Sequence, residues 1–440
     1  MDLVKALRLS KTTRAALVGS GGKTTAMFQL ARDYGSRVIV TTTTHLALEQ
    51  LKLADQHFTV EKESDLPKLV HKISGDILLF SGPQAETDRV KGPDPKILNK
   101  LADLADQWEC PLLIEADGAR QLPIKAPGAH EPPVPDFINA VIILVGLSGL
   151  GKPLDAMSVH RPGLFSKLVG LPEGSELTSQ HLVTALTSPQ GGLKNIPPAA
   201  RKILLINQID CFPNWRIFHD HMPVLLKYFH AVGFTVLEDQ MLLELHERIA
   251  GIVLAAGGST RFGTPKQLLD WHGKPLVRHV AETALEGGLS PVLVITGADQ
   301  EDISSELIGL PVEAVYNPDW ELGQGTSVKK GIESLSKNVG AAVFLLVDQP
   351  FITPELLEKL RKAHVSKRAP IIQPEVNGDR VNPVLFDQGV FPELLHLKGD
   401  TGGRVLFNAY TARTISWDDN LIKKDIDTLE DYQELRSVGE

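Results

Sequence analysis

The sequence predicts an α/β protein of two domains, and three observations support this prediction. Short apolar runs of strand length alternate with helical stretches through both halves of the chain, which is the pattern of parallel-sheet proteins. The length of 440 residues corresponds to two or three domains of usual size. Small residues follow an apolar run at residues 19–22 and again at 255–259, so each half carries its own candidate ligand site.

Composition narrows the class of protein. The net charge is −9, so the chain lacks the overall basic field that favours nucleic acid. Cys110 and Cys211 are the two cysteines, and they form neither a disulfide framework nor a zinc motif. Apolar runs such as 140–145 are far shorter than the roughly 20 residues of a membrane helix. With no signal peptide in the sequence, we expect a cytoplasmic protein that binds neither membrane nor nucleic acid.

The first half opens with an apolar strand at 15–18, a Gly-rich loop and a helical run at 26–34. Such a loop exposes backbone N–H groups and a helix N-terminus to phosphate. The spacing departs from GxxxxGK[ST], and the shorter G-x-x-G-K-T-T form resembles the ATP loop of Mur ligases. We predict a P-loop-like site for ATP or GTP, although an ordinary Gly-rich turn is the alternative. Lys23 would hold phosphate and Thr24 would ligate Mg²⁺. The predicted nucleotide-binding residues are Gly19, Gly21, Gly22, Lys23, Thr24 and Thr25.

Other strands of this half end in polar residues. The run 112–114 leads to Glu115 and Asp117, which would share one side of a strand, and Asp117 is our predicted metal ligand. The run 38–40 leads into threonines and His45. The run 203–206 leads to Asn207-Gln208-Ile209-Asp210, which partly resembles the guanine-reading element of GTPases; common turn residues are the alternative.

Residues 10–240 resemble the YqeC family. The resemblance rests on GSGGKTT, on IEADGAR at 114–120 and on the Pro-rich loops that follow. It implies an accessory step in the maturation of molybdenum hydroxylases, including the selenium-dependent type, without naming the reaction. Polar residues of the Pro-rich loops could face a ligand or simply be solvated: Lys125, His130, Glu131, His160 and Arg161.

The boundary between the halves is abrupt. Residues 241–248 predict a helix that leads straight to the strand 252–254, with no Gly/Ser or Pro linker between them. We place the domains at 1–247 and 248–440.

The second half opens with the strand 252–254, small residues at 255–259 and two cations, Arg261 and Lys266. Small residues let the backbone approach phosphate oxygens, and Arg and Lys suit phosphate charge. The pattern predicts capture of a nucleoside triphosphate, with Arg261 and Lys266 in catalytic roles; a plain turn with surface cations is the alternative. The predicted nucleotide-binding residues of this loop are Leu254, Ala255, Ala256, Gly257 and Gly258.

Two later strands carry further candidates. The run 291–296 ends in Thr296 and Gly297, and the run 341–347 ends in Asp348. A carboxylate at the carboxyl end of a buried parallel strand lies where ligands bind in open α/β sheets, so Asp348 is the predicted catalytic metal ligand. A helix N-cap is the alternative role.

A carboxylate cluster follows near residue 427. We predict Asp427 as the second metal ligand, with Asp425 as the rival. Asp427 or Thr428 could instead cap a helix at 429–436, and both roles could hold together.

The second half resembles the MobA-like nucleotidyltransferases, in particular the molybdenum cofactor cytidylyltransferase type. Its Leu254–Lys266 segment matches the pattern LAAGxSxRxGxxK, and matching elements follow in family order to about residue 432. Leu429 and Gln324 stand where the family usually has Pro and Met. One matching element adds three predicted nucleotide-binding residues: Asn317, Gly323 and Ser327. The others are the substrate-side segment 378–386 and the loop 398–404.

Together with the resemblance of the first half to the YqeC family, this resemblance implies that the chain forms two Rossmann-like three-layer domains. It also implies Mg²⁺, CTP as donor, the molybdenum cofactor as acceptor and a molybdenum hydroxylase apoenzyme as a partner. CTP is favoured because relatives that transfer GMP carry LAGG in place of LAAG. Two alternatives stay open. The acceptor could be a sugar or polyol phosphate, or the chain could be a nucleotide-gated cofactor carrier without turnover.

Overall fold

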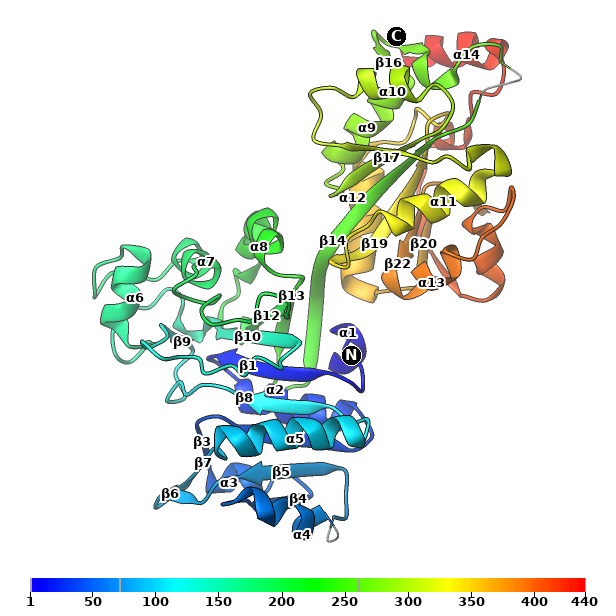
Figure 1. Cartoon of the computed structure of the whole chain (residues 1–440). Helices are drawn as coiled ribbons and strands as arrows, with labels where there is room; N and C mark the ends of the chain where they lie inside the picture. Colours follow the sequence, from blue (N-terminus) through cyan, green and yellow to red (C-terminus); the bar gives the residue numbers. More distant parts are fainter. Residues whose placement is uncertain (1, 71–72, 259–261, 440) are drawn as a thin grey trace. The chain divides into compact units, whose positions relative to one another are not determined.

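The computed structural model describes residues 2–70, 73–258 and 262–439 (Figure 1). The chain divides into two compact units, Met1–His246 and Glu247–Glu440, and each is described by itself. In the described part of the chain, no helix is both long and apolar enough to cross a membrane.

The first unit is built on a parallel sheet. Its strands, in spatial order, are β13 (Ala231–Val236), β12 (Arg201–Asn207), β10 (Ala140–Gly146), β1 (Arg14–Gly19), β8 (Leu112–Glu115), β2 (Val38–Thr42), β5 (Ile77–Ser81) and β4 (Gln56–Thr59). β10 is apolar and buried along its whole length, as expected for a parallel strand covered on both faces. The predicted strands at 15–18, 112–114 and 203–206 are confirmed.

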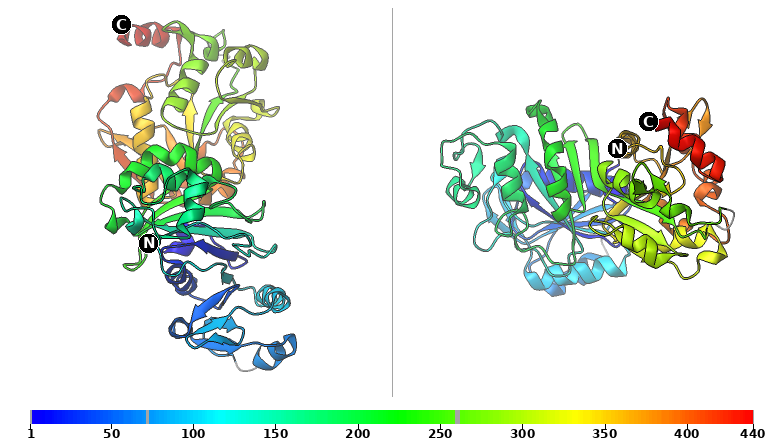
Figure 2. Two further views of the ribbon diagram at one scale, coloured as in Figure 1. Left: turned by 90° about the vertical axis from the view of Figure 1, so that its left-hand side faces the viewer. Right: turned by 90° about the horizontal axis from the view of Figure 1, so that it is seen from above.

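Helices cover both faces of this sheet. On one face, α1 (Leu3–Ala6) and α2 (Lys23–Asp33) pack on Leu17 and its neighbours. On the other, α5 (Pro95–Gln107), α7 (Ser179–Thr187) and α8 (Met222–Tyr228) pack on Ala16 and Val18 (Figures 1 and 2). Alternate residues of β1 therefore enter different cores, which gives three layers.

Smaller elements surround the carboxyl ends of these strands. β9 (Ile124–Lys125) pairs with β11 (Val159–His160), and β3 (His45–Ala47), β7 (Arg89–Lys91) and β6 (Gln84–Glu86) form a second small sheet. The short helices are α3 (Leu48–Leu51), α4 (Leu66–Val70) and α6 (Pro162–Val169).

The helix predicted at 241–248 is wrong. These residues belong to β14 (Met241–Ala255), a strand that continues without interruption into the second unit. Most residues at 241–248 favour helix locally, but Leu242 and Leu245 are buried in the core of the first unit. Tertiary burial and strand pairing have overridden local propensity here.

The second unit is also a sheet between two helical layers. Its strands, in spatial order, are β18 (Glu313–Tyr316), β17 (Val292–Thr296), β14, β19 (Val339–Leu346), β22 (Val384–Asp387) and β20 (Ile371–Val376), with β21 (Asp379–Arg380) and β23 (Ala412–Ser416) beside β20. β17, β18 and β19 run parallel to β14, whereas β22 is antiparallel. The predicted strands at 252–254, 291–296 and 341–347 are confirmed, with small shifts at their ends.

The two faces of this sheet have separate cores. Val253 lies with α9 (Leu276–Glu286) and α12 (Pro354–Lys367), whereas Ile252 lies with α11 (Gln324–Glu333) and α13 (Phe391–Leu394). α10 (Gln300–Glu306), α14 (Leu429–Arg436), β15 (Asp270–Trp271) and β16 (Lys274–Pro275) complete the unit. Both units are thus mixed α/β layers, as the sequence predicts.

Candidate functional sites

The Gly-rich loop of the first unit has the predicted strand–loop–helix context. It joins the end of β1 to Lys23, the first residue of α2. Gly19, Gly21 and Gly22 have positive φ values of 95°, 74° and 125°. A Cβ atom on Gly21 would lie 2.4 Å from the backbone nitrogen of Gly146, so the loop also needs glycine for close backbone approach.

Lys23 lies among buried carboxylates. Its Nζ donates to the Gly19 carbonyl at 2.8 Å and lies 3.3 Å from Asp117 and 3.9 Å from Glu115. Burial raises the pKa of Glu115, although Lys23 and Thr24 oppose this rise. β8 ends at Glu115, so Asp117 lies in the following loop and not on the strand as predicted. Both carboxylates nevertheless reach the same lysine.

Thr24 contacts Glu115 and not the predicted metal ligand Asp117. The Thr24 hydroxyl donates to Glu115 Oε2 at 2.7 Å and accepts from Gln50 Nε2 at 3.0 Å. Asp117 Oδ2 accepts instead from Lys125 Nζ at 2.8 Å and from the Gly19 N–H at 3.0 Å. A cation beside Thr24 would therefore meet Glu115 first, and sequence reasoning underrated this carboxylate.

Charges continue from Asp117 into the Pro-rich loops. Lys125 also lies 3.1 Å from Glu131, and Arg161 binds both oxygens of Glu131 at 2.6 Å. The Arg161 hydrogen bonds outweigh burial and hold the pKa of Glu131 at about 2. Lys125, Glu131 and Arg161 therefore form an ordered network and are not merely solvated loop residues.

Asn207 holds the Gly-rich loop and is not available to read a base. Its Nδ2 donates to the Gly21 carbonyl at 2.7 Å. Its Oδ1 accepts from Thr235 Oγ1 at 3.1 Å and from the Leu237 N–H at 2.9 Å. Gln208 accepts a hydrogen bond from Ser148. The structure therefore argues against the guanine-reading role considered for residues 207–210.

The loop opens into a large cavity. Its volume of about 1290 Å³ exceeds the roughly 300–1,000 Å³ of ordinary small-molecule sites. The cavity reaches from Gly21–Thr25 to the Pro-rich loops, so it has room for a nucleotide and a second molecule. Five cationic side chains line it: Lys23, Arg89, Lys91, Arg120 and Arg161.

The second unit places its small-residue loop at the end of β14, between β17 and β19. Gln267, which sequence reasoning did not single out, fixes this loop: its Nε2 donates to the Ala255 carbonyl at 3.0 Å and to the Gly257 carbonyl at 2.6 Å. The available signal was its place in the segment Pro265-Lys266-Gln267, which belongs to the matched family pattern. Arg261, a predicted catalytic residue, lies outside the described residues.

Asp348 and Lys266 line one cavity of the second unit. Lys266 Nζ lies 3.9 Å from Asp348 Oδ2 and 2.9 Å from Asp427 Oδ1. Burial, reinforced by the negative charges of Asp425 and Asp427, raises the pKa of Asp348 to about 6 although Lys266 opposes it. The N-cap role considered for Asp348 is wrong, because Thr353 caps α12.

The C-terminal carboxylates take different roles. The Ile426 N–H donates to the Asp348 carbonyl at 2.9 Å, which brings residues 425–427 to the end of β19. Asp425 accepts from Gln349 Nε2 at 2.6 Å, whereas Asp427 reaches Lys266. Thr428 caps α14, so of the two capping residues considered from sequence it is Thr428 that takes this role, while Asp427 pairs with Lys266.

The other predicted nucleotide-binding residues fall into two groups. Thr296 and Asn317 are buried, and Asn317 Nδ2 donates to Ser327 Oγ at 3.0 Å, so these two residues support the site from behind. A Cβ on Gly297 would lie 2.6 Å from the Ala256 carbonyl oxygen, which makes Gly297 a packing requirement. Predicted residues on the cavity wall are Leu254, Ala256, Gly257, Gly323, Ser327, Lys266 and Asp348.

Two cavities meet at this site. One cavity, of about 430 Å³, is lined by the cavity-wall residues of the preceding paragraph and by Trp320. The other, of about 290 Å³, is lined by Asn382, Arg404 and apolar side chains. They share four residues: Leu254, Gln324, Leu346 and Asp400. The arrangement suits two substrates that bind side by side, one of them against Asp348 in the larger cavity.

Family models match both units. The YqeC protein model matches residues 15–163, and the MobA-like NTP transferase domain model matches residues 251–414. The chain is 34% identical over 204 residues to the uncharacterized protein YqeC of Escherichia coli K12, covering 45% of this chain and 77% of the relative. It is 30% identical over 196 residues to nicotine blue oxidoreductase of Paenarthrobacter nicotinovorans, covering 42% of this chain and 96% of the relative. The chain belongs to both families.

The MobA-like match makes the second unit a nucleotidyltransferase. Among solved structures, Rv0371c from Mycobacterium tuberculosis H37Rv is similar at 26% identity with a TM-score of 0.40, over 43% of this chain and 98% of that protein. The YqeC match assigns the first unit to a family. The match names no reaction, so the proposal for this unit rests on the cavity described above.

The network around Glu131 predicts a pH-dependent stability. Because its folded pKa lies near 2, below the usual 4.5, Glu131 contributes stability that is present above about pH 4.5 and is lost as pH falls toward 2. Glu131→Gln should lower Tm at pH 7, and its difference from wild type should shrink at pH 3. Thermal melts at both pH values test this, with the exposed Glu63→Gln as control. A difference that is equal at both pH values would contradict the ionic role.

Proposed function

We propose that the second unit transfers CMP from CTP to the molybdenum cofactor, releasing pyrophosphate. The observation that carries the proposal is a pair of adjoining cavities that share four lining residues, with Asp348 and Lys266 on the wall of the larger one. The loop 254–257 and Lys266 would bind the triphosphate in the larger cavity. Asn382 and Arg404 would face the acceptor in the smaller one, where a guanidinium suits a phosphate group.

The donor set at this site fits a hard divalent cation. Asp348 and Asp427 both lie beside Lys266, and the pKa of Asp348 is raised to about 6 by burial and by the neighbouring negative charges of Asp425 and Asp427. A cation among these carboxylates would relieve their repulsion, and carboxylate oxygens are ligands that Mg²⁺ accepts. Asp348 and Asp427 would hold the ion, with Asp425 kept in place by Gln349. When bound, Mg²⁺ supplies charge neutralisation for the triphosphate.

The chain itself would act mainly by positioning. An oxygen of the acceptor's terminal phosphate forms the new bond to the α-phosphorus of CTP, and the bond from that phosphorus to the bridging oxygen of pyrophosphate breaks. An ionised phosphate is already a nucleophile, so no protein base is required. Lys266 would exchange its ion pair with Asp427 for one with the triphosphate. Gln267 would hold the backbone of the loop that faces the phosphates.

The first unit would bind ATP or GTP in a P-loop-like manner and handle a related step of cofactor maturation. Lys23 and the N-terminus of α2 would meet the β- and γ-phosphates of the nucleotide, because a helix N-terminus favours anions. Mg²⁺ would be held by Thr24 with Glu115, and Asp117 stays the alternative carboxylate. The cationic far side of the cavity suits an anionic second substrate, which fits a phosphorylated cofactor precursor.

The transfer assay tests the reaction and the base together. Full-length protein is incubated with Mg²⁺, molybdenum cofactor and each nucleoside triphosphate, and dinucleotide and pyrophosphate are measured. CTP should exceed GTP in kcat/KM, and Ala256→Gly should narrow this preference because it imitates the LAGG sequence. A wild-type preference for GTP would contradict CMP transfer. Turnover with a sugar phosphate but not with the molybdenum cofactor would contradict the cofactor as the acceptor. The absence of any turnover would favour the alternative that the chain is a cofactor carrier and not an enzyme.

Asp348→Asn should reduce transfer by about 100-fold or more, because it removes charge beside the triphosphate while keeping the side-chain shape. The fold should survive, since the substitution also removes a carboxylate whose ionisation burial opposes. Steady-state kinetics with Tm as a companion measurement check this, and Asp302→Asn, on the exposed side of α10, is the matched control. Wild-type turnover in Asp348→Asn would exclude the residue from the mechanism.

Lys23→Gln should abolish ATP or GTP binding by the first unit and leave CMP transfer nearly unchanged. The reason is that Lys23 supplies the cation of the Gly-rich loop, while the transfer residues lie in the other unit. Nucleotide titration of the full chain and steady-state transfer kinetics are measured on the same preparation, with Lys62→Gln as control. Unchanged ATP and GTP binding would contradict the phosphate-loop role, and lost transfer would mean that the two sites are coupled.

A further inference from the structure

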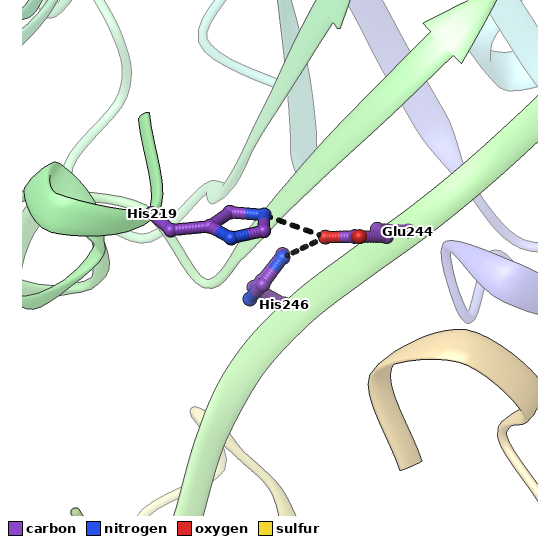
Figure 3. Close-up of side chains that lie close together, drawn as sticks. All are labelled: His219, Glu244 and His246. Atoms are coloured by element: carbon purple, nitrogen blue, oxygen red, sulfur yellow. Dashed lines mark hydrogen bonds and ion pairs between the residues drawn. The ribbon is translucent and has the colours of Figure 1, made fainter. Parts of the chain in front are cut away.

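Three side chains of the first unit converge away from the Gly-rich loop. His219 lies in the 3₁₀ segment Trp215–His221, and Glu244 and His246 lie in the first part of β14 (Figure 3). Nε2 of His219 lies 2.9 Å from Glu244 Oε2, and Nε2 of His246 lies 2.8 Å from the same oxygen. One carboxylate oxygen therefore faces two imidazole nitrogens.

This arrangement has the composition of a transition-metal site. Two His nitrogens and one carboxylate oxygen form a common protein ligand set for Zn²⁺ and related first-row ions. The candidate ligand atoms all lie within 4.8 Å of one another. Around a tetrahedral zinc ion, ligand atoms would be about 3.3 Å apart, given bond lengths of about 2.0–2.2 Å. Each His–Glu contact would widen by about half an ångström to admit the ion, and the two imidazole nitrogens, which lie within 4.8 Å of each other, would come to about 3.3 Å.

The backbone and neighbouring rings hold the three side chains in place. Glu244 and His246 are two residues apart on a strand, so they project to the same side. The ring of Phe234 packs edge-on against His246 at 5.7 Å, and the ring of Trp215 packs edge-on against His219 at 5.6 Å. Both aromatic residues are buried. The imidazoles are thus preorganised by packing.

The cluster is partly open to water. The side chains of His219, Glu244 and His246 are 38%, 19% and 16% exposed. Water can therefore complete the coordination of an ion, which is the usual state of a site with three protein ligands.

We propose that His219, Glu244 and His246 bind a divalent transition-metal ion of the Zn²⁺ class. The ion would join the 3₁₀ segment 215–221 to β14, two parts of the first unit that are distant in sequence. Its ligands are nitrogen-rich, so it would prefer Zn²⁺ over Mg²⁺, which favours oxygen ligands. The site is separate from the residues proposed to bind nucleotide. A plain hydrogen-bonded clamp of His, Glu and His is the competing explanation.

Zinc titration of the metal-free full-length protein distinguishes the two explanations. Zn²⁺ is added in competition with a chromophoric chelator, and the wild-type chain should bind one ion. His219→Gln and His246→Gln should each weaken binding by about 100-fold or more, since removing even an outer partner of a metal ligand typically costs roughly 10–100-fold. His221→Gln is the matched control, because His221 lies in the same segment and contacts Ser179. Its Zn²⁺ affinity should equal that of wild type.

Thermal melts distinguish variants that have lost the Zn²⁺ site from variants that no longer fold. Zn²⁺ should raise the Tm of wild type and of His221→Gln, and it should leave the Tm of folded His246→Gln unchanged. Mg²⁺ at the same concentration should raise none of them through this site. The proposal is overturned if wild type binds no Zn²⁺ above chelator competition, or if His221→Gln loses affinity as much as His246→Gln does. Equal affinity in all variants would likewise show binding elsewhere.

Discussion

The parallel pairing of strands is the constraint on which both sites depend. In each unit, parallel strands bring their carboxyl ends to one edge of a sheet, so the loops that follow them must gather there. In the second unit, the pairing of β14 with β17 and β19 brings Leu254, Ile295 and Leu346 to the same level. Strand pairing alone therefore places the loop that follows Ala255 near the carboxylate of Asp348.

Buried charge is the second constraint. It explains why the loops around Asp117 and Glu131 are held by a continuous series of ion pairs. A buried lysine and a buried carboxylate are tolerated only when paired, because each loses its hydration. Lys23, Asp117 and Lys125 form such a series, which Glu131 and Arg161 extend to the surface. The cations of this series could exchange their carboxylate partners for an anion, so ligand binding and local packing depend on the same side chains.

Sequence reasoning succeeded where a feature was local. The strand, glycine loop and helix at 15–33 and the cap at Thr428 follow from residue order alone. It failed at 241–248, where the burial of Leu242 and Leu245 against distant strands decides the conformation. It also missed Gln267 as the residue that fixes the loop, and the contact of Glu115 with Thr24, because each depends on side chains that only the folded chain brings together.

The attachment of residues 425–427 to the end of β19 has a consequence for how the transferase site comes into being. Lys266 and Asp427 are 161 residues apart, and the Ile426 N–H that binds the Asp348 carbonyl lies next to Asp427. A chain that stops short of residue 425, through premature termination or proteolytic trimming, would lose Ile426 and Leu435 from the core of the second unit. It would lack one of the two carboxylates beside Lys266. Loss of a short C-terminal segment would therefore remove both a charge from the site and part of the core of the unit that carries it, so the chemistry of the site and the integrity of the C-terminus are linked.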